Sequence, residues 1–131
     1  MGVQITVLDE TATGETTGGL TLDFLTERIT VRELIRSRVY QEVHEYDAGR
    51  SGSFRGLVQP EHAERTLNGF RLQQGRAIDW ERQYDLALKA FRGNGVIILV
   101  DGRQLEDLDE EIELRPATRV AFLRLVPLVG G

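Results

Sequence analysis

Apolar and polar residues alternate over the first strand-length segment of the chain. Val3, Ile5 and Val7 are separated by polar residues, which is the two-residue period of a strand with one buried face. The polar, glycine-rich segment 9–19 predicts a long loop, and the alternation resumes over 20–24. We therefore expect a β-hairpin at the start of the chain.

The period changes to that of a helix after Thr30. Thr30 precedes Glu33 by three residues, and this is the capping-box spacing that satisfies free N–H groups at the start of a helix. The apolar residues that follow recur in one helical stripe: Val31, Leu34, Ile35, Val39 and Val43. The pattern predicts a helix over about 30–46, packed on the apolar face of the hairpin.

The segment after this helix is irregular in composition. Residues 47–56 form a polar, glycine-rich linker. Pro60 and the Asn68-Gly69 pair then predict the start and end of a short helix over 61–67. We expect residues 70–78 to be irregular.

A second full helix is predicted between Asp79, a typical capping residue, and Gly93. Its larger apolar residues fall on one face: Trp80, Tyr84, Ala87, Leu88 and Phe91. Such a stripe indicates packing against the sheet or the first helix. The whole segment 47–95 is therefore predicted to be a helical insertion.

The last part of the chain returns to strand patterns. Residues 96–100 are a continuous apolar run, and Asp101-Gly102 is a strong hairpin-turn signal before a short strand at Gln104. An acidic stretch over 106–113 follows. The chain then closes with a strand rich in apolar residues, an apolar tail and two glycines.

In this order, the elements resemble those of ubiquitin and its relatives. The match covers residues 3–46 and 96–131, and it is clearest from Val96 onward, in VIILVDGRQLEDLDEEIELRPATRVAFLRLVPLVGG. The resemblance implies an α+β fold of the ubiquitin-like β-grasp type, with a mixed sheet in strand order 2-1-5-3-4. Its last strand then lies in the middle of the sheet, parallel to the first. We expect a single domain over 1–131 with a flexible tail over 126–131.

The resemblance also implies a function for the chain end. In this family an activating enzyme uses ATP and magnesium to adenylate the terminal glycine, here Gly131, and passes it as a thioester to a conjugating enzyme. Target proteins then accept it through an amine. The expected partners are a ubiquitin-activating-like enzyme, a ubiquitin-conjugating-like enzyme, target proteins and a deconjugating peptidase. The arginine-rich, lysine-poor composition suggests a bacterial-type modifier.

Two further interpretations stay open. A sulfur carrier on the same fold forms a thiocarboxylate at its terminal glycine, and a β-grasp interaction module does not use its terminal glycines at all. Deleting Gly130 and Gly131 separates the module from the other two. A mass gain of one sulfur in place of one oxygen identifies the carrier.

The tail departs from that of ubiquitin, which is basic. Pro127 stands where ubiquitin carries an arginine that helps its activating enzyme to choose it, and Leu128 and Val129 continue the apolar character up to Gly130. This implies a cognate activating enzyme with an apolar groove. The apolar recognition patch of ubiquitin is matched only by Leu99 and by Leu125, and both residues are equally compatible with the core.

Composition narrows the chemistry further. The chain has no cysteine and a net charge of −5, so it offers neither a thiolate nor a basic patch for nucleic acid. The two histidines, His44 and His62, are isolated, and the acidic run 107–111 lacks calcium-loop spacing. We expect neither an enzyme nor a metal or cofactor site.

The same composition bears on location and on acceptor sites. Since no membrane-length apolar run or signal pattern is present, we expect no membrane partner and a cytoplasmic protein. Lys89 is the single lysine, and it is the possible acceptor if copies are joined to each other through a side chain.

Overall fold

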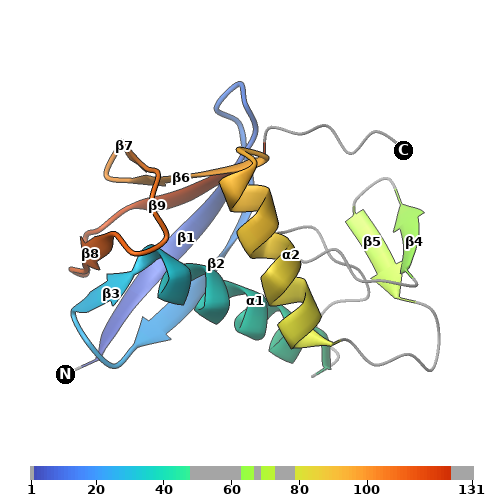
Figure 1. The fold of residues 1–131 in the computed structure, drawn as a ribbon, viewed down its shortest axis with the longest axis horizontal. Helices are drawn as coiled ribbons and strands as arrows, with labels where there is room; N and C mark the ends of the chain where they lie inside the picture. The colour runs from blue at the N-terminus through green and yellow to red at the C-terminus, as the bar shows by residue number, and fades with distance from the viewer. Residues whose placement is uncertain (1, 48–62, 67–68, 73–78, 125–131) are drawn as a thin grey trace.

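The first and last strands meet at the centre of a five-stranded mixed sheet (Figure 1). The computed structural model describes residues 2–47, 63–66, 69–72 and 79–124. The strands of this sheet are β1 (Val3–Glu10), β2 (Thr16–Phe24), β6 (Val96–Val100), β7 (Arg103–Leu105) and β9 (Val120–Arg124), in the spatial order β2-β1-β9-β6-β7. β9 runs parallel to β1, as predicted for the last strand, and antiparallel to β6.

The strand numbering differs from the predicted 2-1-5-3-4 because the described chain forms more strands than that prediction counted. β3 (Arg28–Thr30) and β8 (Glu111–Glu113) form a small separate sheet, and so do β4 (Ala63–Thr66) and β5 (Gly69–Leu72). The fold is α+β, and the four additional strands lie outside the main sheet.

Both long helices lie on one side of the main sheet (Figure 1). α1 (Val31–Asp47) begins where expected, because the Thr30 hydroxyl accepts the backbone N–H of Glu33 at 3.1 Å. α2 (Trp80–Arg92) is capped by Asp79, whose carboxylate accepts two backbone N–H groups at 3.1 Å. The Tyr40 ring of α1 meets the Trp80 ring of α2 edge to face at 5.6 Å between centroids. α2 therefore packs against the first helix.

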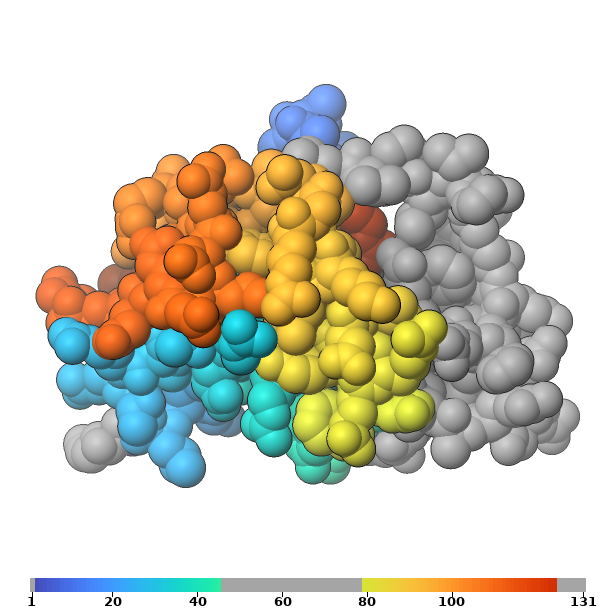
Figure 2. Space-filling view, viewed as in Figure 1, coloured from blue at the N-terminus to red at the C-terminus, as the bar shows by residue number. Residues whose placement is uncertain are grey.

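The core fills the space between the sheet and the helices. Its most deeply buried apolar side chains come from both halves of the chain: Ile5, Val7, Val31, Leu34, Ile35, Val39, Ile98, Leu105 and Val120. The space-filling view shows α2 lying across this face, with its outer side open to solvent (Figure 2). No helix in the described part of the chain is long and apolar enough to span a membrane.

The predicted loop over 9–19 is wrong in its extent. β1 continues to Glu10 and β2 already begins at Thr16, so the turn is confined to 11–15. Gly18 and Gly19 belong to β2, and Gly14 lies in the turn. A Cβ on Gly19 would lie 2.6 Å from the Val7 carbonyl oxygen, so the close approach of the two strands requires a glycine there.

The predicted short helix over 61–67 is wrong at 63–66, and the irregular stretch predicted over 70–78 is wrong at 70–72, while residues 61–62, 67 and 73–78 lie outside the described residues. Residues 63–66 form β4, which pairs antiparallel with β5 over 69–72. The Asn68-Gly69 pair that predicts a helix end is equally typical of a tight hairpin, and pairing between two short strands satisfies backbone groups that so short a helix leaves free at its ends. The described part of the insertion thus holds one helix and one hairpin.

Candidate functional site

The predicted attachment residue and its tail lie outside the described residues. This applies to Gly131, Gly130, Val129, Leu128 and Pro127, and also to Leu125. Arg124, the last residue of β9, is the last described residue before this tail. The described surfaces nearest to the tail are those around the end of β9.

The sheet has a second, outward face, and Leu99 lies on it. Along β6 the buried side chains are Val96, Ile98 and Val100, whereas Ile97 and Leu99 are partly exposed. Since successive side chains of a strand point to opposite faces, Leu99 points away from the helices and the core. The structure thereby resolves whether Leu99 faces the core.

Neighbouring strands extend this outward apolar surface. Leu8 of β1 pairs with Ala121 of β9, which pairs in turn with Leu99, and Leu123 pairs with Ile97 one step further along. All five side chains are partly exposed. We call this set, Leu8, Ile97, Leu99, Ala121 and Leu123, the outer-face patch.

Leu99 is the only member of the outer-face patch that the sequence analysis predicted. Two features of the sequence indicate further apolar residues on the outward face. Leu8 is apolar in the outward phase of β1, whose polar outward positions are Gln4 and Thr6. The unbroken apolar run of β6 means that both faces of that strand are apolar.

The opposite, inward face carries a buried ionic cluster near the end of β9. Arg38 of α1 is 1% exposed, and its Nη2 donates to Asp9 Oδ2 at 2.7 Å while Nη1 donates to Asp9 Oδ1. Glu42 Oε1 lies 3.6 Å from Nη2. The guanidinium carbon of Arg38 lies 4.7 Å from the centre of the Phe122 ring on β9. One side chain thus joins α1, β1 and β9.

The charges of this cluster influence one another. Burial by itself lowers the pKa of Arg38, but the charge of Glu42 and the hydrogen bond to Asp9 outweigh it and raise the pKa above its usual range. Burial lowers the pKa of Arg124, with the charge of Glu42 acting against it and that of Arg38 adding to it. Arg38 therefore stays ionised, and its pairing with Asp9 is a tether between α1 and β1, beside the last strand.

Sequence analysis missed this tether, although position 38 carries a signal. Arg38 falls within the apolar stripe of α1, three and four residues after Ile35 and Leu34. A charged residue at a core position is rare unless it is paired. That signal predicts a buried partner, but only the fold identifies the partner as Asp9, 29 residues away.

The remaining candidates lie apart from this region. Lys89 is exposed on α2. His44 is exposed on α1 and stacks on Tyr40 with 6.3 Å between ring centroids, and His62 lies outside the described residues. Within the described ranges, no group of three or more His, Cys, Asp or Glu side chains is arranged to hold a metal ion.

The acidic run 107–111 forms ion pairs with arginines. Glu110 pairs with Arg103 at 2.7 Å, and Asp109 with Arg32 at 3.4 Å. These contacts fasten the segment before β8 to β7 and α1.

Comparison with protein family models, with curated proteins and with solved structures gave no match in any of the three.

Proposed function

We propose that this chain is a ubiquitin-like modifier of the β-grasp type, activated at the carboxylate of Gly131 and conjugated to target proteins. In this proposal an ATP-dependent activating enzyme forms the acyl-adenylate, and a conjugating enzyme carries the thioester. The chain is then the substrate of these enzymes and not itself an enzyme.

The observation that carries the proposal is the position of β9. It lies between β1 and β6 in the middle of the sheet, it runs parallel to β1, and the chain continues from its end to Gly130 and Gly131. A central strand is held on both sides, so its end is a fixed point on the domain. The seven residues 125–131 span at most about 25 Å when fully extended.

The outer-face patch supports the proposal. Its members Ala121 and Leu123 belong to β9, the same strand that leads to Gly131. A partner enzyme that docks on the patch is therefore within a short chain length of the carboxylate it must activate. On the inward side, the pairing of Arg38 with Asp9 holds the neighbouring part of β1 to α1. The proposed docking surface and Arg124, from which the chain continues to Gly131, thus belong to the same sheet.

The test uses mass spectrometry of the protein isolated from its native cells. Wild-type chain is compared with a chain that lacks Gly131. Branched peptides that join Gly131 to other proteins, and that disappear in the shortened chain, are the expected result. A thiocarboxylate at Gly131 without branches makes the chain a sulfur carrier, and an unmodified end in both strains leaves an interaction module.

A second experiment examines the outer-face patch. We expect Leu99→Ala to reduce the yield of branched peptides at least about tenfold, which corresponds to losing most of the burial of one leucine at an interface. Leu86→Ala is the matched control, since Leu86 is also a partly exposed leucine but belongs to α2, on the other side of the sheet. Equal yields for both variants contradict a role of the patch.

A further inference from the structure

The outer-face patch carries opposite charges at its two ends. Arg119 is exposed and directly precedes β9, whose first residue is buried, so it continues the outward alternation of that strand. At the other end, Glu10 of β1 lies beside Leu123 in register, and its neighbour Asp9 points inward. Four residues of strand separate these two levels, which is roughly 13 Å. An apolar surface thus lies between a cation and an anion.

Neither of these two charges has a partner within the described chain. Among the residues that the structure describes, the side chains of Glu10 and Arg119 form no hydrogen bond and no ion pair. The carboxylate next to them, that of Asp101, accepts the backbone N–H of Arg119 at 2.9 Å and is engaged by the main chain. A molecule that covers the patch without matching the two charges leaves them unpaired in less polar surroundings, which is unfavourable.

The two sides of the patch are uncharged. Leu8 lies opposite Gly19 of β2, and Leu99 lies opposite Gln104 of β7. The outward position before Leu8 on β1 is Thr6. In the described strands, the charges next to the apolar side chains therefore lie at the ends of the patch.

This arrangement is complementary to itself. A two-fold axis that lies between two facing sheets and crosses the strands near Ala121 reverses the strand direction, so Glu10 of each copy comes to lie over Arg119 of the other. Sheets that pack face to face lie about 10 Å apart with their strands aligned within about 30°. A symmetric dimer uses the same surface on both copies, so it needs no second complementary surface.

We propose that the outer-face patch is the interface of a symmetric dimer, with a second copy of this chain as its occupant. Glu10 of each copy pairs with Arg119 of the other, and these two ion pairs fix the orientation. Burial of Leu8, Leu99 and Leu123 supplies the attraction. The patch is small compared with a permanent interface, so we expect a weak dimer with a dissociation constant of about 0.1–1 mM.

The dimer covers the surface on which an enzyme docks in the proposed function. Its consequence for conjugation rests on that function: dimer formation and enzyme docking compete, so the activating enzyme acts on the monomer. The dimer itself does not depend on Gly131.

The test is sedimentation equilibrium of the full-length chain between about 10 µM and 2 mM, with ¹⁵N NMR spectra over the same dilution series. We expect a reversible monomer–dimer equilibrium. The NMR shifts on dilution should be confined to the outer-face patch, Glu10, Arg119 and their neighbours in the sheet. A chain that lacks Gly131 should dimerise as strongly as the full chain, which separates the dimer from conjugation.

Charge reversal tests the predicted pairing. Glu10→Arg and Arg119→Glu each place like charges opposite one another at both ends of the interface, so each variant alone should dimerise at least about tenfold more weakly. In a mixed dimer of the two variants, the arginine introduced at position 10 faces the glutamate introduced at position 119, and the two native charges also face each other. We expect an equimolar mixture to recover dimerisation to within about threefold of the wild type.

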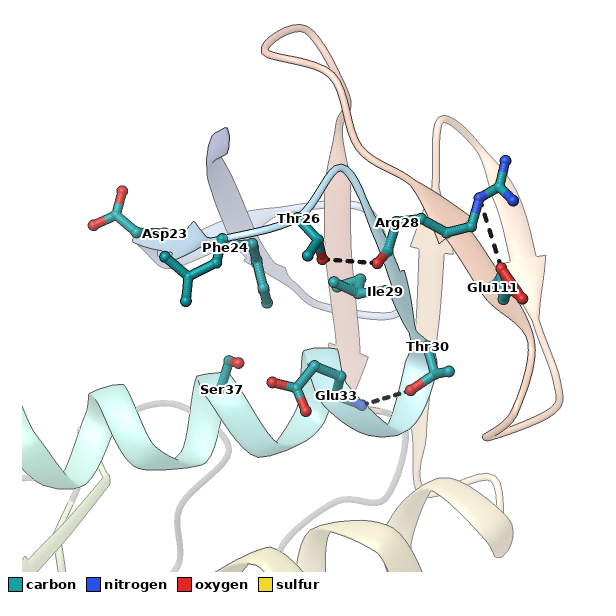
Figure 3. Close-up of a pocket in the computed structure, with 10 residues that line it drawn as sticks. Asp23, Phe24, Thr26, Arg28, Ile29, Thr30, Glu33, Ser37 and Glu111 are labelled. Atoms are coloured by element: carbon teal, nitrogen blue, oxygen red, sulfur yellow. Dashed lines mark hydrogen bonds and ion pairs between the residues drawn. The ribbon is translucent and has the colours of Figure 1, made fainter. Parts of the chain in front are cut away.

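Matched controls come from the groove between α1 and the connection from β2 to β3 (Figure 3). Arg28 and Glu111 form an exposed ion pair there at 3.6 Å, in the small sheet of β3 and β8. Glu111→Arg and Arg28→Glu make the same changes in net charge as the two test variants. Since an exposed ion pair contributes little to stability, both controls should fold and dimerise like the wild type, and the NMR spectrum reports whether each variant is folded.

Three results overturn the proposal. A chain that stays monomeric up to about 2 mM forms no dimer of the expected strength. Test variants that dimerise no differently from their controls show that the outer face is not the interface. A mixture of Glu10→Arg and Arg119→Glu that dimerises as weakly as either variant alone shows that these two positions do not face each other. None of these results affects the mass spectrometry of branched peptides, which depends on Gly131.

Discussion

The Arg38–Asp9 pair, which ties α1 to β1 beside the last strand, is tested most sharply by the substitution Asp9→Asn. Asparagine keeps the size of the side chain and removes its charge, so the guanidinium of Arg38 loses its two-pronged partner at 2.7 Å. Breaking a buried ion pair by removing one partner typically costs about 3–5 kcal/mol. Asp9 is 20% exposed and Glu42 stays within 3.6 Å, so we expect a smaller loss of about 2–3 kcal/mol.

Substituting Arg38 as well separates the contribution of the ion pair from that of the residues around it. Arg38→Met replaces the buried cation by an apolar chain of similar length and avoids the desolvation of a charge, so we expect a loss of about 1–2 kcal/mol. In the double variant Asp9→Asn/Arg38→Met no buried cation is left unpaired. The loss of unfolding free energy in the double variant should therefore be smaller than the sum of the two single losses by at least about 1 kcal/mol, as for groups in direct contact.

The assay is equilibrium unfolding in urea, followed by far-UV circular dichroism and by the emission of Trp80, the single tryptophan. Asp85→Asn, on the exposed side of α2, is the control and should change the free energy of unfolding by less than about 0.5 kcal/mol. If Asp9→Asn is no more damaging than this control, or if the two substitutions are strictly additive, Arg38 and Asp9 do not act as a unit. The role we assign to the tether then fails.

Three smaller predictions concern single contacts. Gly19→Ala should destabilise the chain by about 1–3 kcal/mol in urea unfolding, because the new Cβ lies too close to the Val7 carbonyl; an unchanged midpoint means that the hairpin can shift without cost. Thr30→Ala removes the helix cap and should cost about 1 kcal/mol by the same measurement, whereas Thr30→Ser should retain most of it. Arg36→Ala removes a cation 5.3 Å from the centre of the Trp80 ring, so we expect a changed Trp80 emission and a loss of about 0.5 kcal/mol; an identical spectrum argues against that contact.

Much of the fold could be predicted because its signals are local. The caps at Thr30 and Asp79 start their helices as expected. The Asp101-Gly102 turn joins β6 to β7 with positive φ at both residues, which is the geometry that this dipeptide favours. In each case the information lies within a few residues of the feature it specifies.

The predictions are wrong where pairing with another strand decides the structure. Residues 16–19 carry loop-like composition but become strand because β1 supplies backbone partners. Residues 63–66 become strand because 69–72 lie beside them. Local preference is weak compared with a complete set of backbone hydrogen bonds, so tertiary context overrides it.

The candidate site likewise combines features set by the local sequence with features set by tertiary structure. The sequence determined the strand patterns, the apolar stripe of α1 and the glycines at 130–131, since these are properties of residue type and spacing. Only the tertiary structure decided that Leu8, Leu99 and Leu123 share one outward face, because the register between β1, β9 and β6 sets which side chains are neighbours. It also gave Arg38 its partner, because a buried charge takes whichever opposite charge the packing of α1 against β1 brings within hydrogen-bonding distance.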